Sequence, residues 1–480
     1  MWPTPVIVCV AVMTAQALVQ TWSIEGTVGL FFLMENLQWT YPTVAFLMAS
    51  TAVGSALCAM AIAPWMDQVD GPMLALGAAG VSTLTRGAMA TAATFLSHTT
   101  LIQGYGPAVA AMALIVVQVL DLAILDPWLL LAIDRTIESS LLDDHQPLRN
   151  RVWGVAYSTG NVVMAVGLVI YDVLRTHAPT PATANSMSLW LGTAVSILSL
   201  LILLLLFRHR PSSPRTRSAM RAFLTSPSSS PSSSEGDEFT ATTEKSLWRD
   251  PYFWRFVVFM LLLMGVSSLF RHMNETLPVV LRRLYTDRVH FALVQAVNPV
   301  LITFLAPWLQ SVTAKRPSYW VIAGGSAVSS VAVLALVVDH SGSDTRRWPL
   351  HEASFVEYLP YLFFMIVFSV GEALWSARVT PYTLEVAPRH GKATYRAAAR
   401  LPVLGARLIL AWHASFLLQQ YCPGVPCHPQ SLWLVVWLFT AITPVTLLVF
   451  FHWVRPERPS MTASSTSSAS TAFVNAFFPL

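Results

Sequence analysis

The sequence predicts an all-α integral membrane protein with twelve transmembrane helices in two six-helix halves. Composition is the first observation: 54% of the 480 residues are hydrophobic and 11% are charged, whereas a soluble chain carries about 25% charged residues. The second is that apolar runs recur at about 20 residues, the length that a helix needs to cross a bilayer. The third is that runs such as 191–207 are apolar on every face, whereas the strands of a membrane β-barrel alternate in polarity.

The predicted helices follow one another with short polar segments between most of them. Their approximate bounds are 4–33, 41–65, 72–96, 107–133, 152–174, 186–207, 252–280, 292–312, 318–338, 355–384, 395–418 and 430–454. An even number of spans places both termini on one side of the lipid bilayer. Most of the 29 lysine and arginine residues lie in or beside segments that follow even-numbered spans, so the positive-inside rule makes both termini cytoplasmic. We expect the plasma membrane, and the net charge of +4 reflects this bias rather than a nucleic-acid partner.

Two polar segments divide the chain. The segment 208–250 is rich in serine and proline and has little apolar content, so it predicts a disordered cytoplasmic linker between an N-terminal half, 1–207, and a C-terminal half, 251–457. The serine- and threonine-rich tail, 458–480, has the same character. The sequence APWMDQV ends the second span and APWLQSV ends the eighth, which favours a duplicated transporter architecture with a site between the halves.

Cys422 and Cys427 share a short loop that the charge bias places outside the cell. A disulfide and two free thiols are both open interpretations on that oxidising side. A zinc site is not expected, because only His428 is near. The sequence predicts no metal and no cofactor.

Several motifs resemble those of the proton-coupled oligopeptide transporters, a branch of the major facilitator superfamily. GEALWS followed by YTLEVAP in span 355–384 resembles the tenth helix of that family, and the segment 268–278 resembles its seventh. Pro127 matches the proline of its fourth helix, while Tyr157 and Asn161 match the Phe-Tyr-x-x-x-Asn pattern of its fifth. The resemblance implies a major-facilitator-like fold and a solute cavity between the halves.

The chain also departs from the pattern of that family. The Glu-x-x-Glu-Arg motif of the first helix is not kept at the positions ending with Gln20 and Thr21, and the lysine of the fourth helix is Asp126 here. The superfamily loop motif after the second helix survives as Asp67, with Gln68 in place of the arginine. We therefore expect a distant relative, with Asp67 in the conformational-switch loop.

Glu372 is the candidate proton-coupling residue, because it lies within an otherwise apolar run. A carboxylate inside the bilayer is costly, by roughly 3 kcal/mol on insertion scales, so such a group usually faces a cavity or a partner. Trp375 and Ser376 follow at helical offsets of three and four and share its face. The alternative interpretation is a structural pair between Glu372 and an arginine such as Arg407.

Other charges inside the spans are weighed in the same way. Arg271 and Glu275 are four residues apart on one helical face, so they form either a mutual salt bridge or the two ends of a site for a charged solute. Asp126, beside Pro127, and Glu25 are further candidates for proton coupling. The predicted solute-binding residues are Tyr157, Asn161, Arg271, Glu275, Trp375 and Ser376.

The predicted function is secondary active transport of a small polar solute, such as a peptide, an amino acid or an anion, with protons as the possible coupling ion. The chain contains no Walker-type phosphate loop, and no nucleophile and base are spaced for catalysis, so we expect no enzyme. The alternative is a receptor or sensor that keeps the transporter fold. A channel is a third interpretation, although charges on several helices fit a closed site better than a pore.

Overall fold

The computed structural model describes residues 27–66, 71–98, 146–207, 249–285, 289–338, 355–388, 392–424 and 427–455. Within these ranges the ordered elements are helices, and no strand occurs. The all-α prediction is therefore confirmed for the described part of the chain. The predicted span 107–133, most of the span 4–33 and the polar segments 208–248 and 456–480 lie outside the described residues.

Six described elements come from the N-terminal part of the chain. The end of the first predicted span is α2 (Thr27–Phe31), which continues into a wide π-helical turn, η1 (Phe32–Asn36). The next two spans are α3 (Tyr41–Met66) and α4 (Gly71–His98). The fifth and sixth predicted spans are α7 (Gln146–His177) and α8 (Pro181–Phe207).

The C-terminal elements begin with one long, interrupted span. It consists of α11 (Pro251–Leu262), α12 (Met264–Arg271), the π-turn η3 (His272–Thr276) and α13 (Leu277–Leu284). The wide turn lies directly before Pro278, which lacks an amide proton and whose ring would clash with the carbonyl four residues earlier in a regular helix.

The remaining helices continue this pattern of spans with local breaks. They are α14 (Phe291–Val312), α15 (Ser318–Ala332), α16 (Leu334–Val337), α17 (Phe355–Val386), α18 (Lys392–Ala398), α19 (Leu401–Tyr421), α20 (Pro429–Val449) and α21 (Phe451–Val454). Each begins or ends within a few residues of the corresponding predicted span.

Eight stretches of the described helices are long and apolar enough to cross a membrane. They correspond to the fifth to twelfth predicted spans, and α3 and α4 are helices at the second and third. The protein is therefore a multi-pass, mainly helical chain with membrane-spanning segments. The total of twelve spans remains a prediction.

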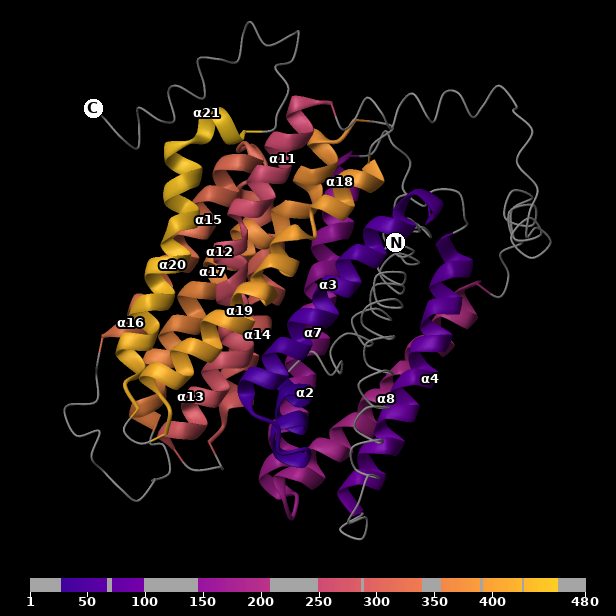
Figure 1. Cartoon of the computed structure of the whole chain (residues 1–480). Coiled ribbons are helices and arrows are strands. Elements are labelled where there is room, and N and C mark those ends of the chain that lie inside the picture. The colour runs from indigo at the N-terminus through magenta and orange to yellow at the C-terminus, as the bar shows by residue number, and fades with distance from the viewer. Residues whose placement is uncertain are drawn as a thin grey trace, which may run out of the picture.

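The helices from the two parts of the chain form two neighbouring groups (Figure 1). In the view of Figure 1, α4 and α8 lie on the right, and α15, α16 and α20 lie on the left. The groups meet where α7 packs against α14 and where α3 packs against α19. Side chains that could line a site between the two helix groups must therefore come from these helices or from the helices beside them.

The two ends of the bundle hold different segments. We call the end that holds η1, the last turn of α13 and the turn between α19 and α20 the Glu35 end, at the bottom of Figure 1. The opposite end holds the start of α11, α18 and α21. These two names are used below to place each contact along the bundle.

Candidate functional site

Glu372 lies in a polar cluster at the seam between the two helix groups. Its side chain is buried, with 4% of the residue exposed. Its Oε2 accepts a hydrogen bond from Asn298 Nδ2 of α14 at 2.9 Å, and its Oε1 lies 3.2 Å from the Tyr157 hydroxyl of α7. The same hydroxyl lies 3.1 Å from Ser376 Oγ. The structure thus brings together three of the predicted site residues, from α7 and α17.

The sequence of α17 explains why one face of this helix carries the cluster. Ser369, Glu372 and Ser376 are spaced three and four residues apart, so they lie on one helical face. Ser369 Oγ accepts the second hydrogen of the Asn298 amide at 3.1 Å. Asn298 itself is 1% exposed and lies in the apolar helix α14, where a buried amide requires such partners.

The hydrogen-bond partners of Glu372 in the described part of the chain are neutral groups. None of the salt bridges among the described residues includes Glu372. The structural pair with Arg407 that the sequence left open is therefore not formed. Burial disfavours the ionised form of a carboxylate without a charged partner, so an ionised Glu372 is costly in these surroundings.

The cluster can hold Glu372 in either protonation state. A tyrosine hydroxyl both donates and accepts, so with an ionised Glu372 the Tyr157 hydroxyl donates to Oε1. With a protonated Glu372 the carboxyl donates to Tyr157, whose hydrogen then turns to Ser376 Oγ. Asn298 donates to Oε2 in both states.

The other predicted residues of these two helices have different surroundings. Asn161 Nδ2 donates to the Tyr157 carbonyl at 2.8 Å, so it bonds within its own helix, α7. Trp375 is 8% exposed and belongs to a buried apolar cluster that also includes Phe256 and Tyr382. Its indole nitrogen has no hydrogen-bond partner among the described residues.

Arg271 and Glu275 lie in the interrupted span, Arg271 at the end of α12 and Glu275 within η3. Arg271 Nη1 is 3.9 Å from Glu275 Oε1, and Glu275 is 3% exposed. The pair is therefore within ion-pair range but longer than the 2.7–2.9 Å of a charge-assisted hydrogen bond. Tyr41 of α3 lies close enough to Glu275 to interact electrostatically with it, so Glu275 is close to a side chain from the N-terminal group.

Asp126, Glu25 and Asp67 lie outside the described residues. Their predicted roles in proton coupling and in the switch loop therefore stay predictions. No group of three or more histidine, cysteine or carboxylate side chains that could hold a metal occurs among the described residues.

A second polar cluster, at the Glu35 end, was not predicted from the sequence. Glu35 Oε1 lies 2.8 Å from Arg175 Nη2 of α7 and 2.6 Å from Arg282 Nη1 of α13. Asn185 Nδ2 of α8 donates to Glu35 Oε2 at 2.8 Å. Glu35 thus joins helices of the N-terminal group to α13 of the C-terminal group, and we call these contacts the Glu35 latch.

Aromatic rings enclose the cations of the latch. The Arg175 guanidinium lies 4.8 Å from the ring centre of Phe31 and 5.2 Å from that of Phe291, and Arg282 lies 5.1 Å from Phe31. The two rings also contact each other, with centres 4.8 Å apart. Cations stacked on ring faces are stabilised electrostatically, more so where water is excluded.

A third contact between the groups lies near the latch. His290 Nδ1, just before α14, is 2.8 Å from Asp172 Oδ2 of α7. The backbone amide of His290 donates to the Tyr358 hydroxyl of α17 at 3.2 Å. Side chains therefore connect the two helix groups at the Glu35 end as well as at Glu372.

The two π-turns carry a carboxylate at the same position. Glu35 is the fourth residue of η1, and Glu275 is the fourth residue of η3. Wide turns of this kind are frequent at functional sites. The hydropathy of the sequence alone does not predict where such turns occur.

Comparison with known proteins identifies the fold. No protein-family model matches this sequence, and no curated protein matches it. Among solved structures, the chain is similar to an auto-inhibited POT family peptide transporter, with a TM-score of 0.67 at 13% identity, over 96% of this chain and 98% of that chain. It is similar to a POT family transporter in complex with 5-aminolevulinic acid, with a TM-score of 0.65 at 12% identity, over 94% of this chain and 97% of that chain.

A nucleoside transporter, NupG, in its D323A mutant form, is also similar, with a TM-score of 0.58 at 13% identity, over 93% of this chain and all of the other. This chain has the major facilitator fold. The expected distant resemblance to the POT branch is therefore confirmed at the level of the fold. The major facilitator relatives are named as transporters, and identities this low carry the fold but not the solute.

Proposed function

We propose that the chain is a secondary active transporter that moves a small polar solute across a membrane by alternating access. The observation that carries this proposal is the Glu372 cluster, in which a buried carboxylate at the seam between two helix groups is held by neutral donors from both groups. Sites at the seam between halves near the bilayer midplane are typical of secondary transporters. The major facilitator fold, similar over nearly the whole chain, supports the same function.

The solute site is proposed to lie around Tyr157, Asn161, Arg271, Glu275, Trp375 and Ser376. Tyr157 and Ser376 support this assignment by their contacts at the seam. The unpartnered indole nitrogen of Trp375 is a further donor that a solute or water can use. Structural relatives bind 5-aminolevulinic acid or are named for peptides and nucleosides, which makes small polar solutes the class to test first.

Glu372 is proposed to carry the coupling proton. In its ionised form it accepts from Tyr157 and Asn298, and in its protonated form it donates to Tyr157. Proton uptake removes a charge from the seam, so it lowers the cost of moving the two helix groups past each other. Release of the proton on the cytoplasmic side would then tie solute entry to the proton gradient.

The Glu35 latch is proposed to close one end of the pathway. Arg282 joins the C-terminal group to Glu35 of the N-terminal group, so opening that end requires this ion pair to separate. With both termini cytoplasmic, as the distribution of basic residues predicts, the Glu35 end faces outside. The structure then corresponds to a state closed to the outside at the described residues.

The experiment that tests coupling is the Glu372→Gln substitution in purified protein reconstituted into liposomes. Thermal stabilisation by a library of peptides, amino acids and nitrate first identifies a solute, because a ligand raises the melting temperature by mass action. Gln mimics the protonated carboxyl permanently. We expect Glu372→Gln to lose accumulation driven by an inward proton gradient while it retains exchange of solute at equal concentrations.

The matched control is Glu385→Gln on the same helix. Glu385 is exposed and accepts a hydrogen bond from Ser318, so its substitution removes a carboxylate from α17 without touching the cluster, and wild-type uptake is expected. Gradient-driven accumulation at the wild-type rate in Glu372→Gln would exclude Glu372 from coupling.

A receptor or sensor is the second candidate function. The absence of the first-helix Glu-x-x-Glu-Arg motif at Gln20 and Thr21 favours it, because a sensor needs a binding site but no coupling. A solute that raises the melting temperature yet is neither accumulated nor exchanged by the wild-type protein would decide for the sensor.

A further inference from the structure

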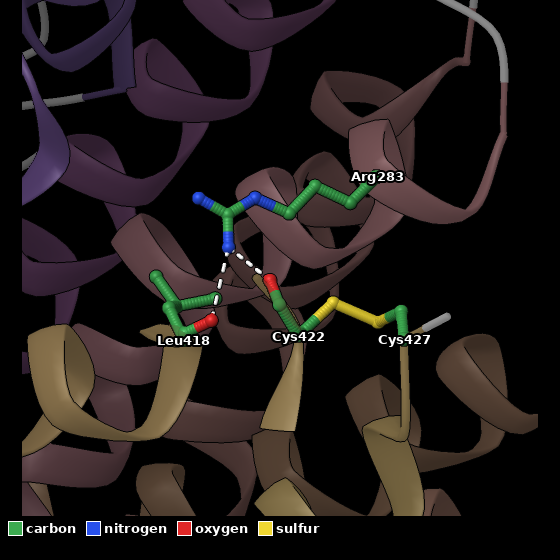
Figure 2. The surroundings of a disulfide bond; sticks show 4 residues. All are labelled: Arg283, Leu418, Cys422 and Cys427. Carbon is green, nitrogen blue, oxygen red and sulfur yellow. Dashed lines mark hydrogen bonds between the residues drawn. A yellow bond between two sulfur atoms is a disulfide. The ribbon is translucent and has the colours of Figure 1, made fainter. Parts of the chain in front are cut away.

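Two adjacent arginines at the end of α13 bind different parts of the molecule. Arg282 pairs with Glu35 across the two helix groups at 2.6 Å. Arg283 Nη1 donates to the carbonyl of Leu418 at 3.1 Å and to the carbonyl of Cys422 (Figure 2). Because the two residues are consecutive in one helical turn, a change in the position of one backbone moves the other.

The acceptors of Arg283 are at the C-terminal end of α19. The last four carbonyls of a helix have no partner within it and carry the negative end of the helix dipole. Arg283 Nη1 carries two hydrogens, so this one nitrogen can donate both to the Leu418 carbonyl and to the carbonyl of Cys422, the residue that caps α19. Arg283 therefore attaches the end of α13 to the end of α19.

A disulfide closes the turn that presents these carbonyls. Cys422 and Cys427 are bonded, which decides the alternative left open by the sequence (Figure 2). The His428 amide donates to the Tyr421 carbonyl at 2.7 Å, across the same turn. Both cysteines are buried, and they belong to the same apolar cluster as Phe31, the ring on which Arg175 and Arg282 stack.

We propose that Arg283 is a positioning residue of the Glu35 latch and that the Cys422–Cys427 turn acts on the latch through it. The disulfide fixes the turn, the turn fixes the carbonyls that hold Arg283, and Arg283 fixes the last turn of α13 from which Arg282 reaches Glu35. The disulfide is thus part of the device that closes the Glu35 end, although it lies entirely within the C-terminal group. This inference rests on the proposed function for the meaning of the latch.

Hydrogen–deuterium exchange of the full chain tests the proposal without any transport measurement. The readout is the segment from Phe32 to Trp39, where the amides of Leu37 and Trp39 bond to carbonyls of η1. Arg283→Gln and the double substitution Cys422→Ala, Cys427→Ala are each expected to speed exchange in this segment by about threefold or more, because exchange reports local opening.

The triple substitution, which combines Arg283→Gln with both cysteine changes, shows whether the disulfide acts through Arg283 or independently of it. If the disulfide acts through Arg283, the triple substitution exchanges no faster in the segment 32–39 than Arg283→Gln alone, since residues of one network are not additive. Arg283→Lys keeps the charge but not the planar fork, so it serves as a milder variant should Arg283→Gln fail to fold, and it is expected to show an intermediate rate.

Two outcomes would overturn the proposal. One is faster exchange confined to 418–428, with the segment 32–39 unchanged. The disulfide would then stabilise only its own turn. The other is additive effects of the disulfide and Arg283 substitutions. Arg255→Gln, which removes a cation stacked on Tyr252 at the opposite end, is the control that should leave the segment 32–39 unchanged. Absence of transport by the wild-type protein, with the expected exchange in the variants, would instead count against the proposed function and leave this inference standing.

Discussion

Glu372, which is buried, and Glu35, whose side chain is 11% exposed, have opposite kinds of neighbour. Glu372 is bonded by a phenol and an amide, whereas Glu35 has two guanidinium partners and an amide. Removal of one partner from a buried ion pair leaves a charge uncompensated, so Glu35 suits a fixed contact. Glu372, without such a partner among the described residues, suits a group that changes its charge.

The Arg271 and Glu275 pair gives a prediction at the same scale. Arg271 and Glu275 lie 3.9 Å apart, within ion-pair range. If they hold the two ends of a charged solute, Arg271→Ala is expected to abolish uptake while the protein stays abundant and folded. Neutralising both residues, with Arg271→Ala and Glu275→Gln, is not expected to restore uptake.

The measurement is solute uptake into liposomes alongside the melting temperature of each variant. A purely structural bridge would behave differently, because removal of both charges would then relieve the defect that each single change causes. Recovery of uptake in the double variant would thus remove the pair from the solute site. The control is Arg255→Ala, which also removes one cation from the same span.

At the scale of elements, the spans of the described helices were predictable and their irregularities were not. Apolar length sets where a helix crosses a membrane, and the bounds of α14 and α17 accordingly lie within a few residues of the predicted spans. Glu35 was missed because it lies just past the predicted end of the first span, where a charge is unremarkable. Asn298 was missed because one amide hardly changes the hydropathy of α14.

The latch gives the prediction for the elements that it joins. Arg282→Gln breaks the contact between α13 and η1 but leaves Glu35 paired with Arg175 and Asn185 within the N-terminal group. No buried charge is orphaned, so we expect a folded protein whose Glu35 end opens more often, by about tenfold in population if the contact contributes about 1.4 kcal/mol.

Spin labels at Thr180 and Phe355, exposed residues of the two groups, measure this opening as a distance distribution. Arg282→Gln is expected to add a longer distance to it. Arg316→Gln, between α14 and α15 at the opposite end, is the control with no expected effect. An unchanged distribution in Arg282→Gln would show that the ion pair does not hold the groups together.

At the scale of the whole molecule, the sequence predicted the fold better than the site. Hydropathy and short motifs were sufficient for a distant resemblance that the structural comparison confirms. The site depends on which faces of distant helices meet, and helical spacing alone cannot predict this. It placed Trp375 with Glu372, whereas in the structure Trp375 belongs to a buried apolar cluster.

Orientation is the prediction that belongs to this scale. A peptide tag inserted near Ser230 in the serine-rich segment is expected to be labelled by antibody only after cells are permeabilised, because the basic residues flank that side of the membrane. Labelling of the tag on intact cells would reverse the orientation, and with it the assignment of the Glu35 end to the outside. A tag after Leu480 should report the same side.

The aromatic enclosure of the Glu35 latch has a consequence for the surroundings in which the protein works. Mobile ions screen charges at an exposed surface over roughly 8–10 Å, but they screen buried pairs much less. The side chains of Arg282 and Glu35, whose ion pair joins the two groups, are 22% and 11% exposed, with the Phe31 ring against the Arg282 guanidinium. Closure of this end is therefore expected to weaken only slightly as the salt concentration of the medium rises.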